Sequence, residues 1–178
     1  MIKNQSRVVI LIYMIGFLLG IVYMNMSAGE YISSMGIFNR DFAEQFQKAD
    51  IEGVQYLGYL IRLRVLPAII LAILGTTRFR KIGSTAFLVW TGILCGVYFT
   101  CAVMNHGVSG VLFCMAGLLP HMVCYLFAYG ILLMTIFFYP KKQWNYEKTI
   151  AFCLAICMGI ALEYKANPVL VKLILKRV

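Results

Sequence analysis

Few side chains in this chain could bind a metal or take part in catalysis, and they lie in or beside long apolar runs. The two histidines are His106 and His121, and Cys124 follows three residues after His121. A metalloprotease would need an HExxH motif or a comparable cluster of histidine and acidic side chains, and neither histidine has an acidic neighbour in the sequence. We therefore predict no metal and no cofactor. We expect His121 to form a hydrogen bond with a carbonyl group freed by Pro120.

Arg62, Arg64 and Glu163 are the charges that we expect inside the protein. The apolar run 65–77 is only about 20 Å long as a helix, too short for a hydrocarbon core of about 30 Å. A helix that crosses must therefore begin near Gln55 and carry both arginines into the outer leaflet. Glu163 lies at the outer end of the last apolar run. Because the arginines point to faces about 200° apart, we predict that Glu163 pairs with one of them. A substrate or lipid-headgroup site is the alternative to a structural ion pair.

Composition places these residues in a membrane protein. Of 178 residues, 62% are hydrophobic and only 13% are charged, which is far more apolar than a soluble domain. The formal net charge is +9, but the basic residues lie at the ends of apolar runs, where membrane topology uses them. The aromatic residues do not alternate with a basic patch, so we exclude nucleic-acid binding.

The apolar runs predict an all-α, multi-pass bundle that forms a single domain over residues 1–178. Lys3 and Arg7 precede the first run and place the N-terminus in the cytoplasm. Between the first two runs, the apolar residues Phe38, Phe42, Ala43 and Phe46 recur at three- and four-residue spacing and predict a short amphipathic helix on the outer surface. Five crossings would place the C-terminus outside the cell. The predicted spans are residues 8–26, 55–77, 82–104, 108–139 and 144–164.

The fourth run contains a predicted break. A helix over residues 108–139 would be about 48 Å long, and Pro120 within it removes one backbone donor and clashes with the preceding turn. Such a break survives in lipid only where protein or a wet cavity covers it. We therefore expect two segments at an angle, after an outer turn at 105–110. Asn105 and Ser109 are expected to cap this turn and the following helix.

The C-terminal end predicts a separate helix. Asn167 precedes Pro168, which suits an N-cap followed by proline at the first helical position. Residues 168–178 would then form an amphipathic helix on the outer surface, with Lys172 and Lys176 on one side.

Small residues mark the faces that helices use to pack closely. The chain has a Gly-x-x-x-Gly pattern at Gly16 and Gly20 and another at Gly92 and Gly96, and such patterns are common where membrane helices touch. The six cysteines lie within apolar runs and form no CxxC pair, so we expect buried thiols between helices. They are Cys95, Cys101, Cys114, Cys124, Cys153 and Cys157.

In order and spacing, several motifs together resemble those of the stage II sporulation protein M family. The first is a signal-anchor-like span followed by a short polar outer loop. The later motifs are Leu74-Gly75, Gly92-Ile93-Leu94-Cys95-Gly96-Val97, Asn105-His106-Gly107-Val108-Ser109-Gly110, Leu119-Pro120-His121, Glu163-Tyr164 and Asn167-Pro168-Val169-Leu170. They cover most of the chain, from the first span to the tail.

The resemblance implies a five-span protein of the cell membrane in endospore-forming bacteria. Such a protein acts in engulfment as a non-enzymatic scaffold for peptidoglycan hydrolases, the stage II sporulation proteins P and D. The residues leave two other classes to weigh. A small permease-like subunit of a transporter would use the break at Pro120 as a midplane site. An intramembrane enzyme would need a nucleophile and base, and the sequence shows no such set. Assembly into a homo-oligomer stays open.

Overall fold

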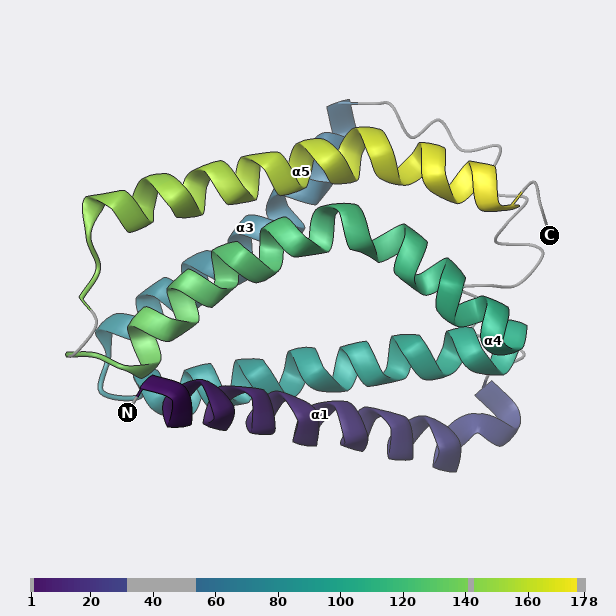
Figure 1. Ribbon diagram of the computed structural model, residues 1–178, viewed down its shortest axis with the longest axis horizontal. Helices are drawn as coiled ribbons and strands as arrows, with labels where there is room; N and C mark the ends of the chain where they lie inside the picture. The colour runs from purple at the N-terminus through teal and green to yellow at the C-terminus, as the bar shows by residue number, and fades with distance from the viewer. Residues whose placement is uncertain (1, 32–53, 141–142, 176–178) are drawn as a thin grey trace. The chain divides into compact units, whose positions relative to one another are not determined.

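The part of the chain that a computed structural model describes, residues 2–31, 54–140 and 143–175, is helical and contains no strand. Three segments are long and apolar enough to cross a membrane, and the segment His121–Phe137 is apolar but shorter. The predicted all-α membrane class is therefore supported. The surface helix expected between the first two spans falls largely outside the described residues. The helices are α1 (Ile2–Tyr31), α3 (Val54–Thr76), α4 (Arg80–Phe137) and α5 (Tyr146–Leu175) (Figure 1).

The chain divides into two compact units. The first comprises Met1–Lys48 and Thr85–Cys114, and the second comprises Ala49–Ser84 and Met115–Val178. Helix α4 contributes to both. Each unit has its own packing, and the two are described separately.

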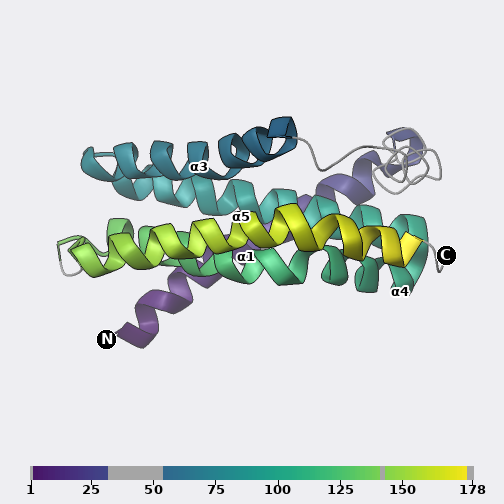
Figure 2. The same ribbon diagram turned by 90° about the horizontal axis from the view of Figure 1, so that it is seen from above.

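In the first unit, α1 packs against the first half of α4 through glycines. A Cβ atom at Gly16 or Gly20 would overlap the carbonyl oxygen of Val89 or Ile93, and a Cβ atom at Gly96 would overlap that of Phe17. The two Gly-x-x-x-Gly patterns predicted as packing faces are thus each other's partners. Residue numbers rise together along the contact, so the two helices run in parallel, and Figure 2 shows α1 crossing α4 obliquely.

The turn predicted between the third and fourth spans is reduced to one residue. Within α4, only Gly107 has non-helical torsions, with φ 58° and ψ −141°. An L side chain avoids this conformation, which glycine adopts freely. The predicted outer turn at 105–110 is therefore too wide, because the helix assignment continues on both sides of Gly107. The side chains of Asn105 and Ser109, the expected caps, lie outside the described part.

The second unit is built from α3, the 115–137 segment of α4, and α5. Helix α3 matches the span predicted at 55–77 to within one residue at each end. It contains Pro67, which removes the backbone donor for the carbonyl of Leu63. At its end, the hydroxyl groups of Thr76 and Thr77 donate to carbonyls of the last turn, each at 2.7 Å. Helices α3 and α5 contact each other, and Figure 1 shows α3 passing behind α5 at an angle.

Two predicted breaks are not found in the helices of this unit. The backbone at Pro120 is assigned to α4, whose only non-helical residue is Gly107, so the helix is not split at the proline. A bend there stays a prediction. Helix α5 continues to Leu175 through Asn167 and Pro168. The expected N-cap at Asn167 and the separate tail helix are therefore wrong, because the backbone keeps its helical course through the proline. The side chains of both prolines lie outside the described part.

Candidate functional site

The centre of the second unit is an ion pair between α3 and α5. The Arg64 guanidinium donates from Nε to Glu163 Oε2 at 2.9 Å and from Nη2 to Glu163 Oε1 at 2.5 Å. Glu163 is buried, with 5% of its surface exposed. Two parallel hydrogen bonds from one guanidinium are the strongest geometry that such a pair adopts. The predicted pairing of Glu163 with one arginine is confirmed, and the other arginine, Arg62, is exposed.

The position of Glu163 along its helix differs from the prediction, whereas that of Arg64 agrees with it. Arg64 lies near the middle of α3, about 15 Å along the axis from Val54 and about 18 Å from Thr76. Glu163 was expected at the outer end of the last span, but α5 continues beyond it to Leu175. Charges usually mark the ends of apolar runs. Here Glu163 lies within α5, and Arg64 and Tyr125 satisfy its carboxylate inside the helix group.

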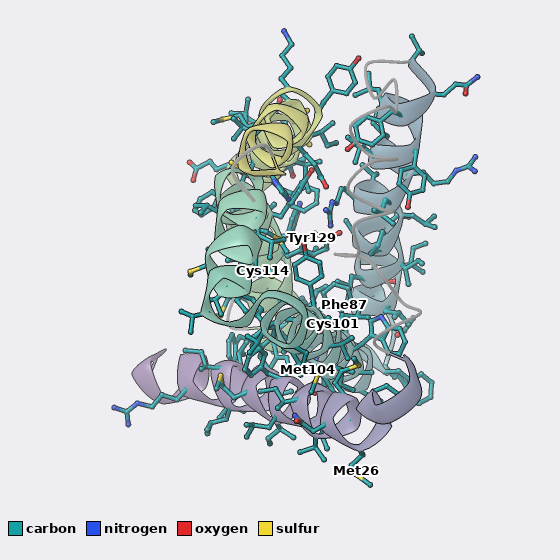
Figure 3. All side chains as sticks on the ribbon, turned by 90° about the vertical axis from the view of Figure 1, so that its right-hand side faces the viewer. Met26, Phe87, Cys101, Met104, Cys114 and Tyr129 are labelled. Atoms are coloured by element: carbon teal, nitrogen blue, oxygen red, sulfur yellow. The ribbon has the colours of Figure 1, made fainter. Side chains whose placement is uncertain are left out.

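Two tyrosines of α4 complete the charge cluster. The Tyr125 hydroxyl donates to Glu163 Oε2 at 2.7 Å, and the Arg64 guanidinium carbon lies 4.8 Å from the centre of the Tyr125 ring. Tyr129 donates to the backbone carbonyl of Arg64 at 2.6 Å, and Figure 3 shows its side chain between the helices. Gly159 leaves room for this arrangement, because a Cβ atom there would lie 2.6 Å from the Tyr125 ring.

His121 borders the charge cluster. It is 2% exposed, its Nε2 atom lies 3.9 Å from Glu163 Oε1, and its ring meets that of Tyr125 edge-on at 5.9 Å. Its Nδ1 atom has no hydrogen-bond partner among the described residues. In the described structure, Nδ1 therefore does not form the bond expected to a carbonyl freed by Pro120. The ring faces the ion pair instead.

Chemically, the cluster is suited to holding charge and helices in place. A carboxylate accepts hydrogen bonds when ionised, and Glu163 accepts three, two from Arg64 and one from Tyr125. Among the described residues, no group of three or more His, Cys, Asp or Glu side chains is placed to hold a metal ion. The arrangement links α3, α4 and α5 through Arg64, Tyr125, Tyr129 and Glu163.

The cysteine prediction holds for one part of the chain and fails for another. Cys101 and Cys114 are buried in the first unit, and Figure 3 labels both. Cys153 and Cys157 are exposed, although all six were expected between helices. They lie on the outer face of α5, because Ala155 and its neighbours turn the opposite face inward.

Sequence reasoning missed the two tyrosines, although a signal for them exists. His121, Tyr125 and Tyr129 recur every four residues, and this spacing places them along one face of a helix. Within an apolar run, three such polar side chains on one face point to a polar partner on a neighbouring helix.

Comparisons of the chain with protein-family models, with curated proteins and with solved structures give no match. The site and the motifs of the sequence therefore carry the functional argument.

Proposed function

We propose that the chain is a non-enzymatic scaffold of the cell membrane, similar to the stage II sporulation protein M family. It would hold peptidoglycan hydrolases for the remodelling of the septal wall during engulfment. The observation that supports this most is the cluster of Arg64, Glu163, Tyr125 and Tyr129, which ties three helices together. A scaffold needs helices that keep a fixed arrangement, and a bidentate ion pair with further hydrogen bonds provides one.

The proposal includes five membrane crossings. Three segments meet the length and hydropathy that a crossing requires. The apolar segment His121–Phe137 and helix α5, about 45 Å long, would supply the other two. The N-terminus would then lie in the cytoplasm, and residues 27–53 and the C-terminus would lie outside. Secreted hydrolases would meet the protein at these outer segments.

A co-purification experiment in the native host tests this function. A tagged chain is expected to retain a peptidoglycan hydrolase, and deletion of the gene is expected to block engulfment or otherwise impair envelope remodelling. The variant Glu163→Gln should retain less hydrolase, because it loosens the helix group. The matched control is Glu147→Gln, which makes the same change at an exposed position of the same helix.

One observation favours a second candidate, a permease-like transporter subunit. Ionisable side chains within membrane helices often mark a transport pathway, and His121 is a buried imidazole beside the ion pair with Nδ1 unpartnered in the described structure. Recovery of an ATPase as the sole stable partner would overturn the scaffold proposal in favour of this one.

A further inference from the structure

An apolar groove lies in the second unit, and it begins at Val65, the residue after Arg64. Its volume is about 150 Å³, and its walls come from all three helices: Ala68, Ile69 and Ala72 of α3, Leu132 of α4, and Phe152 and Ile156 of α5. The alanines of α3 leave the space that larger side chains would fill. Aliphatic and aromatic walls of this kind favour apolar ligands over water.

The groove opens to the outside of the helix group. Ile69 is 49% exposed, and Ala72 is also exposed. Drug-sized ligands occupy pockets of about 300–1,000 Å³, so this groove is too small for one. A hydrocarbon chain that enters from the side would fit, because only part of its length has to be covered.

Basic residues follow the helix end toward which the groove points. The groove follows α3 toward its C-terminal end and α5 toward its N-terminal end, where Trp144 contributes to the wall. Both of these ends lie on the left side of Figure 1. The chain that follows α3 carries Arg78, Arg80 and Lys81, and the Arg80 guanidinium carbon lies 4.5 Å from the centre of the Tyr139 ring.

Trp144 marks the level of the membrane surface at this end. Tryptophan is enriched at the boundary between hydrocarbon and headgroups, and the indole is held by a hydrogen bond from Nε1 to Thr149 Oγ1 at 2.8 Å. An acyl chain in the groove would therefore place its headgroup beside the basic residues 78–81. The first turn of α5 contributes one negative charge, Glu147, against the three positive charges of Arg78, Arg80 and Lys81.

We propose that this groove is a binding site for an anionic phospholipid. One acyl chain lies along the alanines of α3, and Arg78, Arg80 and Lys81 bind the phosphate. Charge complementarity selects this lipid over a zwitterionic one, because each basic residue near an anionic lipid surface adds about five-fold to binding. The inference does not depend on the scaffold function.

Native mass spectrometry of the full chain tests the proposal, with phosphatidylglycerol and phosphatidylcholine of identical acyl chains as competing probes. The wild-type protein is expected to retain phosphatidylglycerol in clear excess. The double variant Arg78→Gln/Lys81→Gln should lower the ratio of the two bound lipids by roughly twenty-fold, since it removes two basic residues. Lys165→Gln, which removes an exposed charge far along α5 from the groove, should leave the ratio unchanged.

The acyl-chain half of the proposal has its own variants. Ala72→Trp fills the groove from an exposed position and should reduce retention of both lipids, whereas Ile73→Trp changes the neighbouring residue, 61% exposed and outside the groove wall, and should not. Equal retention of the two lipids by the wild-type protein would overturn the proposal. So would equal losses in Ala72→Trp and Ile73→Trp.

Discussion

Glu163 is a buried carboxylate, and the free-energy cost of burying its charge depends on the groups that pair with it. Two opposite charges in a medium of low dielectric attract strongly, but the removal of both from water opposes that gain. The net contribution of the pair is therefore modest, while the loss of one partner leaves the other buried and unpaired. Arg64 keeps 25% of its side-chain surface exposed, so Glu163, at 6%, is the more sensitive of the two.

Glu163→Gln is expected to lower the stability of the protein by about 1–3 kcal/mol. The amide has one accepting oxygen in place of two, so it cannot form the bidentate pair with Arg64 and also accept from the Tyr125 hydroxyl as the carboxylate does. Once Glu163 is glutamine, Arg64→Gln should cost little more. A double-mutant cycle on thermal unfolding in detergent measures this coupling.

Arg62 provides the matched control for this cycle. Arg62→Gln is the same substitution as Arg64→Gln, two residues away on α3 and at an exposed position. The pair Arg62→Gln and Glu163→Gln should show additive effects. Additive effects for Arg64 and Glu163 would contradict the role assigned to the ion pair.

At the residue level, the sequence predicts the charges of the site better than its neutral members. Arg64 and Glu163 could be paired in advance, because helix length alone placed opposite charges in one leaflet. Tyrosine is common in apolar runs, so the residue type alone did not indicate that the Tyr125 hydroxyl binds Glu163. His121 was assigned to the nearest freed carbonyl, and only the three-dimensional packing shows that it faces the ion pair.

At the level of elements, the contact between α1 and α4 depends on the absence of side chains. Gly96→Ala should lower stability by about 1–3 kcal/mol, because the new methyl group would overlap the Phe17 carbonyl oxygen and force the helices apart. Gly58→Ala is the control, since nothing lies within 4 Å of its Cβ position. It should be neutral or stabilise α3 by about 0.5–1 kcal/mol. Thermal unfolding of both variants checks this, and equal losses would argue against the close contact.

Helix boundaries were predictable where polarity changes sharply and not where proline was the only signal. The start of α3 follows from the length that a crossing requires, and its end follows from the basic loop after it. Asn167 and Pro168 suggested a helix start, yet α5 passes through them to Leu175. Proline is tolerated inside membrane helices when neighbouring groups satisfy the freed carbonyl, so its presence alone does not fix a boundary.

For the whole molecule, five crossings predict which side of the membrane each loop and terminus faces. After replacement of the native cysteines, single cysteines at Val108 and Val178 should react with an impermeant reagent on intact cells. A cysteine at Thr77 should be protected until lysis, because the loop after α3 would face the cytoplasm. Val108 and Thr77 are exposed, and Val178 lies outside the described part. Protection of Val178 on intact cells would contradict an odd number of crossings.

The pairing of Arg64 with Glu163 also sets an order of events during synthesis. The two residues are separated by 99 positions in the chain. At about 5–20 residues per second, the ribosome needs roughly 5–20 s to make the partner after Arg64 has emerged. If both helices cross the membrane as proposed, α3 holds an unpaired arginine near its middle during that interval. Its final insertion would then wait for α5, and the membrane insertion machinery would have to shelter α3 until the last helix is made.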